Sequence, residues 1–436
     1  MDNTTSIEAN WSLKSSERTK TGVFLAATIG YGLFYVCRLS LNVLKKSIVD
    51  TGYLTESELG IIGSALFFSY AIGKFVNGFL ADRLNVRLFM AVGLFMAALI
   101  NLILGFKVSF ICFVILWGMN GWFQSIGSPC CVISLRRWYT EKELGPVYGY
   151  WSASHNIGEA MTFIITAFIV SLFGWQSGFF SSSILGFIGV ALILVFLKLS
   201  PDTASNINKI PQKKVQQEIG KSQLAVIKNP MIWLLAMGSA FMYIARYAVN
   251  SWGIYYFEIE KGYSLVEASS LISVSSVCGI IGTIFSGAFS AKFFGGNRTL
   301  PAVIMSLINL CSLALFLFGP IRNYYMDMVF MILFGISIGV LICFLGGLMA
   351  VDLAPKSASG AALGIIGVAS YLGAGLQDIV SGWLFESQKV FNEAGTITYN
   401  FSSIRFFWLF SAAMSLLFLL LILFLQKNRI VNSNAK

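Results

Sequence analysis

The chain has 436 residues, of which 56% are hydrophobic and only 11% are charged. Soluble globular domains carry about 25% charged residues, so the composition excludes a water-soluble chain with an ordinary polar surface. The formal net charge is +10, but the sequence contains no soluble basic domain that could hold a nucleic acid, and we expect no nucleic-acid partner.

Apolar runs recur along the whole sequence, and each is long enough to cross a lipid bilayer as a helix. A helical span needs roughly 20 apolar residues, whereas strands of a membrane β-barrel are about ten residues long and alternate apolar with polar side chains. We therefore predict an all-α membrane protein whose twelve spans lie at residues 22–45, 60–81, 88–106, 109–134, 147–173, 178–200, 231–257, 268–292, 299–319, 324–350, 359–385 and 403–426.

A long polar stretch at residues 201–230 separates six predicted spans from the other six. It indicates two six-helix bundles, at residues 22–200 and 231–426, joined by this stretch as a linker. Short polar tails remain at residues 1–21 and 427–436.

Lys and Arg are distributed unevenly between the two sets of loops. They concentrate in both tails, in the linker and in the loops on the same side of the spans, whereas the opposite loops hold few, Lys45 and Lys46 among them. Because basic loops stay on the cytoplasmic side of a membrane, we expect both termini and the linker to be cytoplasmic.

The first helix of each predicted bundle carries the same three polar residue types at the same spacing. They are Tyr35, Arg38 and Asn42 in the first bundle and Tyr243, Arg246 and Asn250 in the second. Residues three and seven apart lie on one face of a helix. Residues 78–83 and 145–158 are likewise echoed at residues 287–292 and 360–373. The sequence therefore predicts two duplicated halves.

Arg38 and Arg246 lie well inside apolar spans. A charge at the middle of the membrane costs about 2.5–3.5 kcal/mol, so we expect both to face a water-filled cavity between the halves and to converge on one central site. Paired guanidinium groups suit phosphate, because each donates two parallel hydrogen bonds to its oxygens. Alternatively, each arginine pairs with a buried carboxylate, for which Glu159 and Asp378 are the clear candidates.

For other polar residues inside the spans the sequence allows more than one role. Lys74 either adds a third positive charge to the cavity or extends toward the membrane interface. His155, the only histidine, is either a packing residue or a phosphate ligand that changes charge near neutral pH, as phosphate does. Asp378 follows Gln377 in the eleventh span, where a carboxylate could balance a cation, bind a proton or accept substrate hydroxyls.

At this point the chain resembles the major facilitator superfamily and, within it, the organophosphate:phosphate antiporters, which include bacterial hexose-phosphate and glycerol-3-phosphate transport proteins. The matching segments are spread over nearly the whole chain. They are the helix segments around Arg38 and Arg246, residues 78–83, 121–130, 155–158, 296–298, 353–356 and 371–373.

The resemblance implies the superfamily fold and roles for individual residues. Four residues are expected to bind the phosphoryl group, namely Arg38, Arg246, Lys74 and His155. Secondary substrate contacts are expected from Tyr35, Tyr243, Asn42, Asn250, Asn156, Gln377 and Asp378. Gly78, Asp82 and Arg83 are expected to form a gating loop.

The chain also departs from the family pattern. Glu159 stands where a small residue is usual, and an acid beside a phosphate site repels the ligand unless it faces away or binds a sugar hydroxyl. Residues 84–87, Ser128, Cys131 and Ala291 differ as well. These differences concern the substrate more than the family.

We therefore expect a monomeric secondary transporter in a bacterial inner membrane. It would exchange a hexose 6-phosphate, with glucose 6-phosphate as the first candidate, for inorganic phosphate, and it would need no cofactor or metal. The alternative is a membrane sensor of external glucose 6-phosphate that signals to a partner kinase. A membrane enzyme such as a phosphatase is disfavoured, because the chain has a single histidine and no clustered Asp/His metal set.

Overall fold

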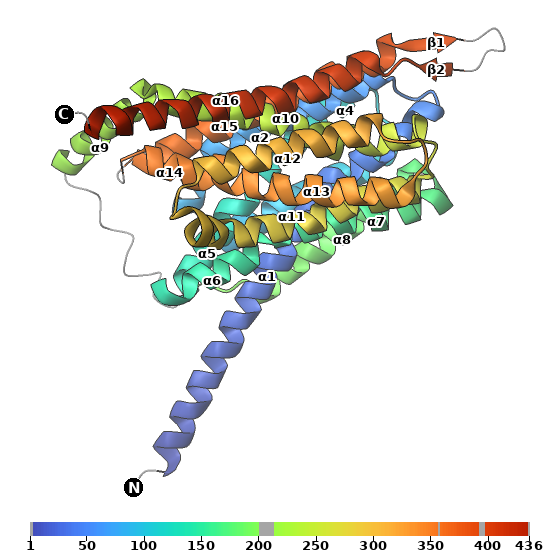
Figure 1. Ribbon diagram of the computed structural model, residues 1–436. Helices are drawn as coiled ribbons and strands as arrows, with labels where there is room; N and C mark the ends of the chain where they lie inside the picture. Colours follow the sequence, from blue (N-terminus) through green and yellow to red (C-terminus); the bar gives the residue numbers. More distant parts are fainter. Residues whose placement is uncertain (1–2, 200–212, 356–357, 392–396, 435–436) are drawn as a thin grey trace.

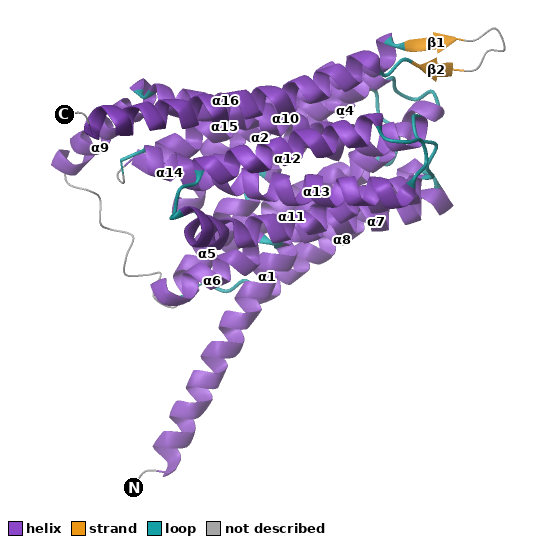
Figure 2. Cartoon of the chain, viewed as in Figure 1, coloured by secondary structure: helices purple, strands orange, loops and turns teal. Residues whose placement is uncertain are grey.

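The computed structural model describes residues 3–199, 213–355, 358–391 and 397–434. Helices make up almost all of this part, and a two-stranded hairpin is its only sheet (Figure 2). The described residues contain 12 helical segments that are long and apolar enough to cross a membrane. The prediction of an all-α protein with twelve spans is therefore confirmed.

The first half of the chain, called here the N-terminal half, contributes the helices α1 (Asn3–Asp50), α2 (Glu56–Arg83), α3 (Val86–Leu104), α4 (Phe110–Gln124), α5 (Gly127–Trp138), α6 (Glu141–Ser152), α7 (Ser154–Phe173) and α8 (Trp175–Phe196). Residues 3–21, expected to be a tail, continue α1 without a break, and this part projects from the bundle (Figure 1). No Gly or Pro interrupts the chain there before Gly22.

The C-terminal half contributes α10 (Pro230–Ile259), α11 (Leu265–Phe294), α12 (Thr299–Phe318), α13 (Tyr324–Cys343), the π-helical turn η2 (Phe344–Leu348), α14 (Met349–Leu353), α15 (Ser359–Ser387) and α16 (Ser402–Asn434). The strands β1 (Lys389–Phe391) and β2 (Ile397–Tyr399) pair antiparallel between α15 and α16. Of the expected linker, residues 213–228 form the helix α9 (Lys213–Lys228), and residues 201–212 lie outside the described residues.

Three spans expected to be single helices are interrupted. The fourth divides into α4 and α5 around Ser125, the fifth into α6 and α7 at Ala153, and the tenth contains η2 between α13 and α14. Pro129 explains the first break, because it has no N–H to donate to the carbonyl of Ser125. The π-helical turn contains the adjacent Gly346 and Gly347, which loosen the helix there.

The two halves pack their helices in the same scheme. In the N-terminal half α1 packs against α7 and α8, α2 against α4, and α3 against α8. The equivalent contacts in the C-terminal half join α10 to α15 and α16, α11 to α13, and α12 to α16. The halves meet through α2 with α15, α7 with α11, and α1 with α10. This correspondence agrees with the duplication that the sequence repeats predict.

The halves are held together toward one end of the bundle, here called the hairpin end because β1 and β2 lie there (Figure 1). On α2 and α15, an added Cβ at Gly60 would lie 2.5 Å from the carbonyl oxygen of Asp378, and one at Gly382 would lie 2.5 Å from that of Glu56. Toward the opposite end, which carries α9 and α14 and is called the linker end, Gly78 and Gly364 have no atom within 4 Å of an added Cβ. The two helices therefore diverge from the hairpin end to the linker end.

Candidate functional site

Arg38 of α1 and Arg246 of α10 both contact Tyr247, between the two halves. A terminal guanidinium nitrogen of Arg38 donates a hydrogen bond of 3.1 Å to the Tyr247 hydroxyl. The guanidinium carbon of Arg246 lies 5.3 Å from the centre of the Tyr247 ring. Both arginines are buried, with 3% and 6% of their surface exposed. The structure therefore brings the two repeat-related arginines to one place.

Four aromatic rings surround Arg38. Its guanidinium carbon lies 4.6 Å from the ring centre of Tyr70, 5.5 Å from that of Tyr35, and 5.6 Å from those of Phe67 and Tyr371. The ring faces attract the cation but accept no strong hydrogen bond. The Nε of Arg38 is buried without a hydrogen-bond partner, and within the described ranges no carboxylate forms an ion pair with it. A buried donor without an acceptor is costly, so this guanidinium lacks one of the partners that a buried arginine normally has.

Arg246 has a carboxylate partner, because its terminal nitrogen lies 3.4 Å from Oε2 of Glu159 on α7. The other oxygen, Oε1, accepts hydrogen bonds from the side-chain amide of Asn250 and from the Ser276 hydroxyl, the latter at 2.7 Å. The alternative prediction, that each arginine pairs with a buried carboxylate, thus holds for Arg246 and not for Arg38. The two arginines, equivalent in the repeat, differ in their electrostatic environment.

A small cavity adjoins this ion pair. It has a volume of about 20 Å³ and is lined by Asn156, Glu159, Arg246, Asn250 and Gly279 together with neighbouring residues of α11 and α13. A cavity of this size holds about one water-sized group, so it is too small for a phosphate ion.

Lys74 and His155 lie beside the rings that surround Arg38. The Nζ of Lys74 lies 5.5 Å from the ring centre of Tyr371, and the Lys74 side chain is exposed. The imidazole of His155 lies 5.7 Å from the ring centre of Tyr35, at an angle of 42°. Both residues therefore adjoin the aromatic group around Arg38, and their contact with a ligand stays a prediction.

The remaining residues of the Tyr–Arg–Asn stripes occupy two different positions. Tyr243 packs against the Tyr371 ring at 5.6 Å, so both stripe tyrosines belong to the aromatic group around the arginines. Asn42 donates a hydrogen bond of 3.1 Å to the backbone carbonyl of Asn250, and the Asn250 amide donates to Glu159. The two asparagines therefore join the halves to each other.

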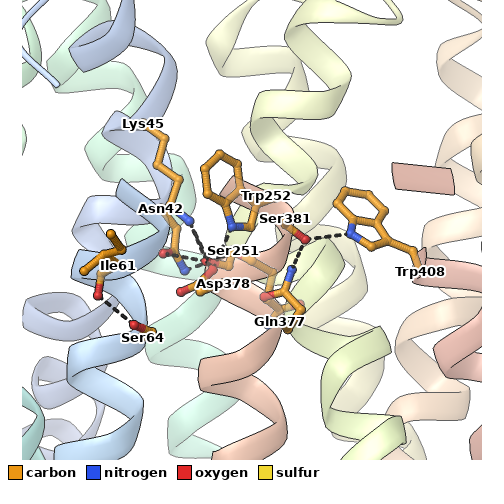
Figure 3. A network of polar contacts seen from close by, with 11 residues as sticks. Asn42, Lys45, Ile61, Ser64, Ser251, Trp252, Gln377, Asp378, Ser381 and Trp408 are labelled. Atoms are coloured by element: carbon orange, nitrogen blue, oxygen red, sulfur yellow. Dashed lines mark hydrogen bonds and ion pairs between the residues drawn. The ribbon is translucent and has the colours of Figure 1, made fainter. Parts of the chain in front are cut away.

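Asp378 pairs with Lys45 rather than with an arginine (Figure 3). Its Oδ1 lies 3.3 Å from Nζ of Lys45 and accepts hydrogen bonds from Ser251 at 2.6 Å and Trp252 at 2.7 Å. The assignment of Lys45 to a loop was wrong. Because α1 continues to Asp50, Lys45 belongs to the helix, and its side chain is 0% exposed between the two halves.

Gln377 does not meet the arginines. Its amide nitrogen donates to the Ser381 hydroxyl at 2.9 Å, and Trp408 of α16 donates to the same hydroxyl at 2.9 Å. Figure 3 shows this group on the side of α15 away from Lys45. Consecutive residues of an α-helix point about 100° apart, so Asp378 faces α1 while Gln377 faces α16.

Gly78, Asp82 and Arg83 lie in the last turns of α2, toward the linker end. The side chains of Asp82 and Arg83 are exposed, and Leu84 follows as the C-cap of the helix. Their role in gating stays a prediction.

Sequence reasoning missed several residues of this site, which are Tyr247, Tyr70, Phe67, Tyr371, Ser276 and Lys45. A signal was present on α2, where Phe67, Tyr70 and Lys74 are spaced three and four apart and therefore share one helix face. No comparable pattern marks Ser276, because its importance comes from Glu159 on a distant part of the chain.

Several proteins are similar to this chain over most of its length. It is 32% identical over 377 residues to the membrane sensor protein UhpC of Salmonella typhimurium, covering 83% of each chain. It is 33% identical over 383 residues to a probable hexose phosphate transport protein of Chlamydia pneumoniae, covering 81% of this chain and 82% of that one. The glycerol-3-phosphate transporter of Bacillus subtilis is 29% identical over 377 residues, with coverages of 82% and 84%.

Solved structures share the fold. The nucleoside transporter NupG superposes with a TM-score of 0.74 at 15% identity, over 93% of this chain and 99% of that one. A bacterial homologue of the human lysosomal transporter Spinster gives 0.72 at 16% identity, over 92% and 96%. The sequence profile of the Major Facilitator Superfamily matches residues 23–377. This chain is therefore a multi-pass membrane protein that belongs to the Major Facilitator Superfamily, a family of transporters and not of enzymes.

Proposed function

We propose that the protein carries a sugar phosphate across the membrane in exchange for inorganic phosphate, with glucose 6-phosphate as the first candidate. The observation that carries this proposal is Arg38, which is buried at the interface of the halves and whose Nε has no hydrogen-bond partner among the described residues. A phosphoryl group supplies the oxygen acceptors that a planar guanidinium fits best. Relatives named for hexose phosphate and glycerol-3-phosphate transport support the same ligand class.

The charges around Arg38 support a dianionic ligand. Arg246 and Lys74 add two further cations to Arg38, and Glu159 removes one positive charge through its ion pair with Arg246. The remaining charge of +2 balances a phosphate monoester, which carries about −1.5 to −2 at neutral pH. His155 is proposed as a further phosphoryl contact, from the side of Tyr35.

The packing of the halves supports alternating access. Hydrogen bonds and ion pairs cross between the halves from the level of Arg38 to the hairpin end, where Glu56 of α2 accepts from Tyr255 and Lys389 at 2.6 Å. Toward the linker end α2 and α15 diverge. An anion would neutralise the cations and let the halves close around it, whereas the empty site would resist closure through repulsion. Only the loaded carrier would then cross, which produces exchange.

The orientation belongs to the same proposal. The concentration of Lys and Arg in the linker, the termini and the loops of that side favours a cytoplasmic linker end. The conformation described here would then be open toward the cytoplasm of a bacterial inner membrane, and one chain would suffice as the functional unit.

The test is uptake of labelled glucose 6-phosphate by vesicles that contain the purified protein. We expect rapid uptake when the vesicles are preloaded with phosphate and little when they are not. Equal uptake from both kinds of vesicle would exclude obligatory exchange. No uptake by either kind of vesicle, and none when labelled glycerol 3-phosphate or labelled inorganic phosphate replaces glucose 6-phosphate, would exclude the transport proposal.

A second candidate is a membrane sensor, favoured by the 32% identity to the sensor protein UhpC. The binding site would be the same, since both functions begin with the same binding event. A sensor would bind glucose 6-phosphate in equilibrium dialysis yet fail to exchange it, and its gene would adjoin genes for a histidine kinase and a response regulator.

A further inference from the structure

Glu159 gives the two arginines different chemistry. Arg38 has aromatic rings and one tyrosine hydroxyl around it, whereas Arg246 lies 3.4 Å from a carboxylate that is itself 3% exposed. A carboxylate this close to a phosphate site repels a second anion. The region of Arg246 and Glu159 therefore suits an uncharged part of the ligand better than a second phosphoryl oxygen.

The hydrogen bonds of Glu159 leave room for one more donor. A carboxylate offers about four acceptor positions, and among the residues that the structure describes Glu159 uses three of them, for Arg246, Asn250 and Ser276. Both protein donors that meet Oε1 come from the C-terminal half, so the carboxylate is held in one orientation across the interface. An ionised acceptor in a fixed orientation discriminates strongly between ligands with and without a hydroxyl.

The adjoining cavity has the size of the group that would use this acceptor position. Its volume of about 20 Å³ accommodates one water molecule or one hydroxyl. Asn156 and Ser275 also line it, so a hydroxyl that enters finds both donors and acceptors.

From these contacts we propose that Glu159, held by Asn250 and Ser276, binds a hydroxyl of the organic part of the ligand and thereby selects polyhydroxylated phosphate esters over inorganic phosphate and simple alkyl phosphates. The proposal rests on the proposed function, because it assigns the specificity of the same site. Arg38 and Lys74 then hold the phosphoryl end, and the pair of Arg246 and Glu159 holds the sugar end.

The test is ligand binding to the purified full chain in nanodiscs, because binding is common to a carrier and a sensor. The probes are glucose 6-phosphate, ethyl phosphate and inorganic phosphate. Glu159→Gln keeps the shape but removes the charge. We expect its preference for glucose 6-phosphate over ethyl phosphate to fall about tenfold, as expected for one hydrogen bond to a charged group, while inorganic phosphate binds as tightly as before or more tightly.

A second variant examines the cavity without removing a charge. In Gly279→Ala the added Cβ would meet its nearest neighbours, the Gly335 carbonyl and Oδ1 of Asn156, at 3.5 and 3.6 Å, which is ordinary van der Waals contact. The helix therefore tolerates the methyl group, which occupies part of the cavity. We expect the affinity for glucose 6-phosphate to fall several-fold and that for ethyl phosphate to stay unchanged.

Asp327→Asn is the matched control, since Asp327 is another buried carboxylate in an ion pair, with Lys261, in the C-terminal half. We expect it to leave the preference between the two esters unchanged. Glu159→Gln with an unaltered preference, or with equal losses for all three probes, would overturn the proposal, because a purely structural carboxylate behaves in that way. A wild-type protein that binds none of the probes would instead overturn the proposed function itself.

Discussion

Lys45 and Asp378 form an ion pair of 3.3 Å between α1 and α15, and their side chains are 0% and 1% exposed. The two residues come from different halves of the chain. The ammonium group also lies 3.8 Å from the centre of the Trp252 ring and 2.7 Å from the Ser251 hydroxyl. In a fully buried ion pair each charge compensates the other, so removal of either one leaves the remaining charge buried without a counter-charge.

Replacement of Lys45 by Met is expected to destabilise the protein more than replacement of both members of the pair. Lys45→Met keeps the contact with Trp252 but leaves the Asp378 carboxylate buried without a counter-charge, at a cost of about 3 kcal/mol. The double variant with Asp378→Asn should recover most of this loss. Thermal unfolding in detergent compares the stability of the wild type, the two single variants and the double variant.

The control for this cycle is Lys46→Met. Lys46 pairs with Asp50 on the same helix, and the side chains of both residues are partly exposed. It should change the unfolding temperature little. If the double variant lost as much stability as Lys45→Met and Asp378→Asn together, the two charges would not stabilise each other in the protein.

The guanidinium of Arg38 should not be replaceable by an ammonium group. Arg38→Lys retains the charge but loses the planar fork, so the affinity for a phosphate ester should fall by about 10–100-fold, as expected for the loss of one charge-assisted hydrogen bond. Calorimetric titration with glucose 6-phosphate measures the change. Arg322→Lys, at an exposed turn, serves as the control and should bind like the wild type. Unimpaired binding by Arg38→Lys would contradict a bidentate role.

If Arg38 binds the ligand as proposed, the hydroxyl of Tyr247 should help to position its guanidinium group. Tyr247→Phe keeps the ring beside Arg246 but removes the acceptor that Arg38 uses at 3.1 Å. We expect the affinity to fall about fivefold, which corresponds to roughly 1 kcal/mol for one hydrogen bond. Tyr256→Phe removes another buried hydroxyl of α10, bonded to the Leu317 carbonyl, and should leave binding unchanged. Equal effects of the two substitutions would indicate a general loss of stability instead.

Glu56 should control the closure of the hairpin end. It is fully buried at the start of α2 and accepts hydrogen bonds from Tyr255, Tyr399 and Lys389 of the C-terminal half. Glu56→Gln removes the ion pair with Lys389 and weakens the contact between the halves. We expect faster amide hydrogen exchange in residues 51–60, with little change at the linker end.

Asp50→Asn provides the comparison for that experiment, because Asp50 lies near the same end but pairs within α1. Its exchange pattern should match the wild type. Exchange in residues 51–60 that does not respond to Glu56→Gln would mean that other contacts, such as the one between Ser57 and Glu386, hold this end closed.

Much of the architecture follows from local properties of the sequence. Apolar runs of sufficient length specify the spans, and the repeated Tyr–Arg–Asn stripe indicates two related halves, because both signals depend on neighbours within a few residues. The interruptions at Ser125 and Ala153 were not predicted, although Pro129 is visible in the sequence. A proline lowers the helix preference nearby, but whether the helix breaks depends on the packing around it.

The sequence by itself determined that Arg38 and Arg246 lie inside the membrane, since a charge within an apolar run has no other position along a spanning helix. Only the tertiary structure decided how each charge is compensated. Arg246 takes Glu159 from α7, Asp378 takes Lys45 from α1, and Arg38 takes no carboxylate within the described residues. These pairings join helices that are far apart in the chain. The sequence alone could not predict them, because the partner of a buried charge is fixed by three-dimensional packing and not by sequence distance.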